Sequence, residues 1–108
     1  MADFDDFKQA VQTGLADLIG NTIGDYADSA QSRANDFLDD SRGDLEKWLK
    51  QLRDDELSAD DFEFLLKGKA ELAHINALLE LGAAKVAVDK FRAGFIQLLK
   101  DSALALLP

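Results

Sequence analysis

An eleven-residue repeat in the first half of the chain is the feature that most constrains its fold. Eleven residues make close to three turns of an α-helix, so each position of the repeat stays on one helix face. Counted from Asp3, the second position is always large and apolar: Phe4, Leu15, Tyr26, Phe37 and Trp48. The fourth position holds aspartate in the first four repeats and lies about 200° around the helix from the second. The repeat therefore predicts an amphipathic, acidic helical arm over residues 3–57.

Two sites within this arm favour a break in the helix. Gly20 and Gly24 flank Asn21 and Thr22, where a glycine that ends one helix can be followed by the cap of the next. Residues 40–43 end in Gly43 and form the second candidate break. The sequence leaves open whether the arm is one bent helix or two or three segments.

A helix start at Ser58 separates this arm from the second half of the chain. Ser58 is a good N-cap, and Asp60 and Asp61 suit the positive end of the helix dipole. Residues 58–108 are then mostly apolar, and the chain's single proline, Pro108, leaves the interior free to be helical. Gly82 either closes the helix that follows Ser58 or is passed through.

These patterns predict one all-α domain: long amphipathic helices forming a helical hairpin or small bundle. The second arm is apolar around most of its circumference, and a single stripe on the first arm cannot easily cover it. We therefore expect self-association to complete the bundle, with a compact monomeric bundle as the alternative. The expected core and interface residues combine large apolar side chains of both arms: Phe37, Trp48, Phe62, Leu65, Leu72, Leu79, Val86, Phe91, Phe95 and Leu99.

Charge and composition exclude several classes of function. The chain of 108 residues has a net charge of −9, and residues 1–61 alone carry 16 acidic against 6 basic residues. Such an acidic half repels phosphate backbones, so we expect no nucleic-acid partner. The chain has no cysteine, which excludes disulfides and thiolate metal sites. The N-terminal residues lack the basic and apolar regions of a secretory signal, so we expect a cytoplasmic protein.

One short motif could carry metal chemistry. Glu71 and His74 form a Glu-x-x-His pair, and this spacing places both side chains on one helix face. Carboxylate-bridged dimetal bundles use this pair twice, and a homodimer could supply the second copy by symmetry. The alternative is a histidine on the helix surface beside a glutamate. We expect no cofactor.

The sequence therefore predicts a non-enzymatic function: helix-mediated association, as a small structural, adaptor or assembly subunit. The expected partner is a second copy or another helical protein. A first alternative is a lipid- or membrane-surface binder that uses the apolar second arm. The eleven-residue period resembles that of apolipoprotein-like lipid-surface helices, although the polar face here carries aspartate rather than lysine and arginine. The second alternative is the metal site at Glu71 and His74.

Overall fold

The acidic arm is divided into three α-helices in the computed structural model, which describes residues 3–69 and 72–106. These helices are α1 (Asp3–Thr22), α2 (Ala27–Asp40) and α3 (Arg42–Arg53). The 3-10 helix η1 (Gly24–Tyr26) joins α1 to α2, and Ser41 separates α2 from α3. The two interruptions fall in the two regions where the sequence favours a break, so the arm consists of segments rather than one bent helix.

The apolar arm is also divided, into α4 (Ala59–Lys67), α5 (Ala73–Asn76), the 3-10 helix η3 (Ala77–Leu81) and α6 (Lys85–Ala105). Ser58 caps α4 as expected, because its Oγ accepts a hydrogen bond of 3.0 Å from the Asp61 N–H. Gly82 closes η3 in the left-handed conformation, with φ of +102°. The described residues contain no strand, so the all-α prediction is confirmed, and the fold is a small bundle rather than a hairpin.

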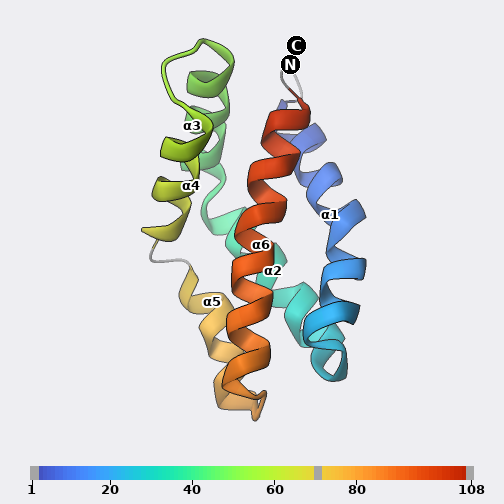
Figure 1. Cartoon of the computed structure of the whole chain (residues 1–108). Helices are drawn as coiled ribbons and strands as arrows, with labels where there is room; N and C mark the ends of the chain where they lie inside the picture. Colours follow the sequence, from blue (N-terminus) through green and yellow to red (C-terminus); the bar gives the residue numbers. More distant parts are fainter. Residues whose placement is uncertain (1–2, 70–71, 107–108) are drawn as a thin grey trace.

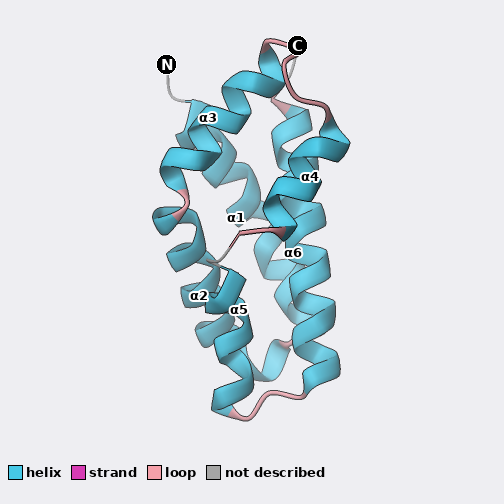
Figure 2. Cartoon of the chain, turned by 90° about the vertical axis from the view of Figure 1, so that its left-hand side faces the viewer, coloured by secondary structure: helices cyan, strands magenta, loops and turns pink. Residues whose placement is uncertain are grey.

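Helix α6 is central to the bundle, as Figure 1 shows. Helix α1 packs along α6, and α4 and α5 also pack against it. Figure 2 gives the view from the side that α3, α4 and α5 occupy. Phe37 reaches from α2 to Phe95 of α6, with ring centroids 5.4 Å apart in an edge-to-face arrangement. Because the first arm is divided, both α1 and, through Phe37, α2 reach α6 within a single chain.

Helices α1 and α6 approach closely through two reciprocal leucine–glycine contacts. A Cβ added at Gly14 of α1 would lie only 2.6 Å from Cδ1 of Leu98 on α6. A Cβ added at Gly94 of α6 would likewise overlap Cδ1 of Leu18 on α1. Each helix therefore presents a glycine and, four residues later, a leucine, and the leucine of one helix packs on the glycine of the other. Both glycines serve close packing, which explains why they are tolerated inside helices.

Burial within the single chain matches most, but not all, of the expected core. Trp48 and Leu65 are half-buried, whereas Leu79 is 40% and Val86 is 66% exposed. Val86 is exposed because it lies two residues before the buried Val88, about 200° around α6. Leu79 is exposed because its neighbour Leu78 takes the buried position in η3. The remaining expected core residues are buried: Phe37, Phe62, Leu72, Phe91, Phe95 and Leu99.

None of the helices in residues 3–69 and 72–106 combines the length and the apolarity needed to cross a membrane.

Candidate association surface

Exposed apolar side chains gather at one end of the bundle, where η3 turns into α6. In the described part of the chain, the large hydrophobic side chains with the greatest exposure are Phe64, Leu79, Leu81, Val86, Leu104 and Leu106. Three of these six lie within residues 79–86, which we call the apolar corner. The corner is the lower end of the molecule in Figure 1. A cluster of this kind within eight residues is a candidate contact surface, whereas single exposed leucines are ordinary.

The backbone of the apolar corner is fixed by the way η3 ends. The Gly82 N–H donates to the Leu79 carbonyl (3.1 Å) and the Ala83 N–H donates to the Leu78 carbonyl (3.3 Å). With Gly82 left-handed, these two bonds make a Schellman motif, which satisfies the last carbonyl groups of η3. Leu78 and Ala83 are buried on either side of the turn. The exposed side chains therefore project from an anchored turn.

The apolar corner is electrically neutral in a strongly acidic protein. Its two charged residues are Glu80 and Lys85, and they have opposite signs. Lys85 donates a hydrogen bond of 2.9 Å to Asp89, four residues further along α6. The whole chain has a net charge of −9, so the apolar corner differs in charge from the acidic first arm.

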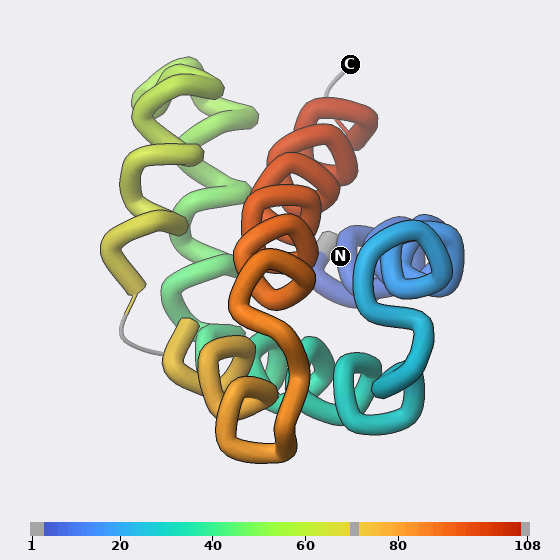
Figure 3. Tube along the Cα trace, turned by 60° about the horizontal axis from the view of Figure 1, so that its bottom comes forward, coloured from blue at the N-terminus to red at the C-terminus, as the bar shows by residue number. Residues whose placement is uncertain are grey.

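A crevice of about 280 Å³ opens beside the apolar corner. One wall is the chain from the last turn of α1 through η1, residues 20–26, and the other wall is Ala83, Ala84 and Ala87. We call it the end crevice. Its alanine wall is small and apolar, whereas the other wall includes the polar side chains of Asn21, Thr22 and Asp25. Tyr26 is close to the corner, since its Oη lies 3.2 Å from the position of a Cβ on Gly82. Figure 3 shows the turn before α6 and the α1–α2 connection together at the end that comes forward.

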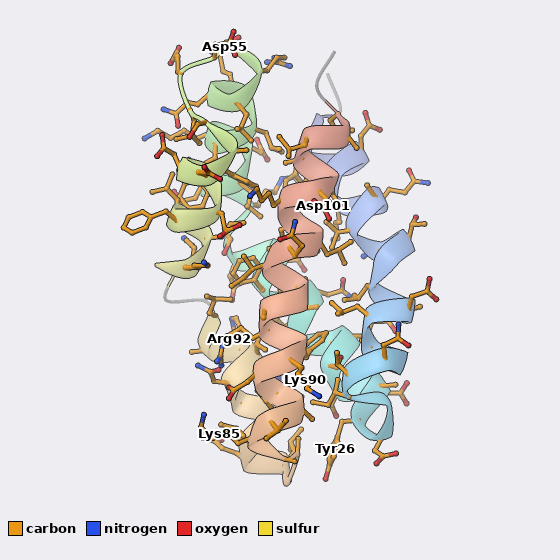
Figure 4. All side chains as sticks on the ribbon, in the orientation of Figure 1. Tyr26, Asp55, Lys85, Lys90, Arg92 and Asp101 are labelled. Atoms are coloured by element: carbon orange, nitrogen blue, oxygen red, sulfur yellow. The ribbon has the colours of Figure 1, made fainter. Side chains whose placement is uncertain are left out.

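A larger groove of about 400 Å³ lies between α4 and α6, above Leu72 and Ile96. The charged groups around it already neutralise one another. Lys67 and Lys100 lie 2.9 and 3.1 Å from the Glu63 carboxylate and hold its pKa below its ordinary value. Across the groove, Arg92 (labelled in Figure 4) donates to Asn76 at 2.6 Å and to Asp89 at 2.8 Å. Each charged side chain that lines the groove therefore already has a partner of opposite sign within the bundle.

The pair proposed for a metal site is described only in part. Glu71 lies outside the described residues. His74 lies in α5, and its Nε2 is 2.6 Å from Oδ2 of Asp40 at the end of α2. This contact joins α5 to α2. The described residues contain no group of three or more histidine, cysteine, aspartate or glutamate side chains placed to hold a metal ion.

Trp48, one of the expected core and interface residues, has aromatic and cationic neighbours within the chain. Trp48 of α3 is half-buried and meets Phe62 of α4 edge to face, with ring centroids 6.3 Å apart. The amino group of Lys69 lies 5.8 Å from the centroid of the Trp48 ring. Periodicity in the sequence singles out neither Leu81 nor the end crevice as a contact surface. The signal in the sequence was the run Gly82-Ala83-Ala84, which interrupts large apolar residues with small ones.

Comparison with protein-family models, with curated proteins and with solved structures finds no match for this chain.

Proposed function

We propose that this protein acts by self-association, as a small assembly subunit without a catalytic role, and that the apolar corner is its contact surface. The observation that carries this proposal is the neutral cluster of Leu79, Leu81 and Val86 at one end of a chain with a charge of −9. Apolar side chains stabilise an interface because their surface is removed from water when the copies bind. A surface without net charge adds no electrostatic repulsion between identical copies.

The charge distribution favours contact through this end over contact through the sides. Two copies that meet along their first arms would bring aspartate-rich helices together, and like charges facing one another destabilise a complex. At physiological salt, exposed charges are largely screened beyond about 8 Å. Contact through the end keeps most of the acidic surface of the two copies beyond that distance.

The size of the end predicts weak association. The Cα trace measures 24 × 20 Å across the short axes, so one end presents on the order of 400–500 Å². Two such faces bury less than the roughly 1,200 Å² at which stable interfaces begin, and interfaces below that size are transient. We therefore expect a dissociation constant between about 10 μM and 1 mM, a range in which concentration controls assembly.

Analytical ultracentrifugation from 10 μM to 1 mM tests this proposal. The mass of the wild type should rise with concentration above the 11.8 kDa of a single chain. Val86→Gln should prevent the rise, because Val86 is 66% exposed in the single chain and would become buried only in the complex. Burial of that side chain contributes about 1–2 kcal/mol per copy.

Phe64→Gln is the matched control. Phe64 is 76% exposed on α4, away from the corner, so its replacement removes comparable apolar surface elsewhere. It should associate as the wild type does. A single-chain mass for the wild type at every concentration, or equal losses in the two variants, would contradict the proposal.

The two other functions considered from the sequence have less support. A lipid-surface role would need the apolar side of α6, and in the bundle that side packs against α1, α4 and α5. Flotation with liposomes tests it directly. A metal role would rest on His74, which already contacts Asp40. Elemental analysis of the purified protein tests that alternative.

A further inference from the structure

We propose that the exposed face of α6 pairs antiparallel with the same face of a second copy, so that two chains form a twofold-symmetric dimer. This inference rests on the proposed function and extends its contact surface, because Val86 belongs both to the apolar corner and to this face of α6. It is carried by the order of side chains along the face, which is complementary to itself when the helix is reversed.

The exposed face of α6 is one continuous stripe of side chains. In Figure 1, α6 lies between α1 on one side and α4 and α5 on the other, and the stripe faces outward between them. Its members follow one another at intervals of three or four residues and fall within about 80° around the helix. We call them the α6 stripe, and all six are exposed: Val86, Lys90, Ala93, Gln97, Asp101 and Leu104.

The two charged residues of the α6 stripe have opposite signs and no ionic partner within the described residues. Lys90 makes no hydrogen bond or ion pair there, and Asp101 only accepts a hydrogen bond of 2.9 Å from Gln97. Figure 4 labels Lys90 toward the lower end of α6 and Asp101 toward its upper end. The other basic residues of α6 each pair with a carboxylate of their own chain: Lys85, Arg92 and Lys100. The stripe therefore keeps one basic and one acidic group available for a second copy.

A twofold axis through the middle of the α6 stripe brings complementary groups together. Phe95 lies midway between Val86 and Leu104 in the sequence. With the axis level with Phe95, Val86 of each copy meets Leu104 of the other. Lys90 then lies within about 2 Å, measured along the helix, of the level of Asp101 in the other copy, since each residue advances about 1.5 Å. Antiparallel pairing thus joins base to acid twice, whereas parallel pairing would set like charges against each other.

The same arrangement covers the exposed apolar side chains at both ends of α6. The apolar corner of each copy lies beside the C-terminal end of α6 in the other copy, where Leu104 is 37% and Leu106 is 40% exposed. Near the axis, the small side chain of Ala93 lies opposite Gln97 of the other copy and lets the two helices approach. The repulsion expected between two acidic first arms does not arise within the stripe, because Lys90 and Asp101 balance in charge.

Charge reversal at Lys90 and Asp101 tests the pairing. Lys90→Glu would set acid against acid at both contacts, and Asp101→Lys would set base against base, so each variant alone should dimerise about tenfold more weakly than the wild type. An equimolar mixture of the two variants should restore dimerisation close to the wild-type level, because both contacts then join opposite charges again. Sedimentation equilibrium measures all four samples, and circular dichroism verifies that the variants are folded.

Lys47→Glu is the matched control, because Lys47 is exposed on α3 and its reversal changes the net charge by the same amount as Lys90→Glu. It should dimerise as the wild type does. Equal losses in Lys47→Glu and Lys90→Glu, or a mixture as weak as its two components, would contradict the antiparallel pairing. If both stripe variants dimerise normally while Val86→Gln does not, the apolar corner acts without the stripe and the proposed function stands. If the wild type is monomeric throughout, the proposed function itself fails.

Discussion

Replacement of Gly94 by alanine tests the packing of α1 against α6, on which the bundle depends. Two effects oppose each other in Gly94→Ala. Alanine is favoured over glycine inside a helix by about 1 kcal/mol. The new Cβ would overlap Cδ1 of Leu18, so that leucine must leave its position on the glycine. Displacing a packed side chain in this way costs about 1–3 kcal/mol. We expect a net loss of about 1 kcal/mol in the free energy of unfolding.

A second substitution changes the sign of this effect. In a Leu18→Ala background the overlap is gone and only the helix preference remains, so Gly94→Ala should stabilise by about 1 kcal/mol. The coupling between the two sites is then about 2 kcal/mol, within the range for residues in contact. Urea unfolding followed by circular dichroism at 222 nm, at about 1 μM so that the chain is largely monomeric, measures all four proteins.

Gly43→Ala is the matched control for helix preference. A Cβ at Gly43 meets nothing within 4 Å, so this variant should gain a few tenths to 1 kcal/mol. If Gly94→Ala stabilises the wild type as Gly43→Ala does, Leu18 does not pack on Gly94 and the close approach of α1 and α6 is refuted.

Three further predictions concern single contacts. Ser58→Ala removes the N-cap hydrogen bond of α4 and should lower the free energy of unfolding by about 1 kcal/mol in urea titrations. An unchanged urea midpoint would show that this hydrogen bond does not stabilise the fold. Gly82→Ala forces a side chain into a φ of +102° and should cost about 1–2 kcal/mol by the same assay. The pKa of Glu63 is lowered by Lys67 and Lys100, so its contribution to stability is complete above the ordinary glutamate pKa and is lost as pH falls through the lowered value. Glu63→Gln should therefore show a shallower decline in stability than the wild type as the pH falls below the ordinary glutamate pKa.

Local signals in the sequence predicted the helix boundaries well where one residue decides them. Ser58 caps α4 because its hydroxyl can accept the Asp61 N–H, a contact within four residues. The interruption after Thr22 lies between Gly20 and Gly24 for a similarly local reason. The division after Lys67 was not foreseen: α4 ends with Gly68 as its C-cap, and α5 packs on α2, a contact between segments far apart in the sequence.

The contact surface was less predictable because it depends on which apolar side chains the other helices of the bundle bury. Periodicity placed Leu79 and Val86 with the apolar arm, but it did not show that Gly82 would end η3 and reset the phase of α6. The end crevice joins residues 20–26 with residues 83–87, which are far apart in the sequence. The spacing of apolar residues within one helix does not predict which distant segments lie side by side.

The most direct test of self-association through the apolar corner is sedimentation equilibrium of the wild type across 10 μM to 1 mM. We expect a mass that rises from 11.8 kDa toward 23.6 kDa, twice the single-chain mass, with Val86→Gln remaining at the lower value. A wild-type mass that stays at 11.8 kDa over the whole range would contradict it.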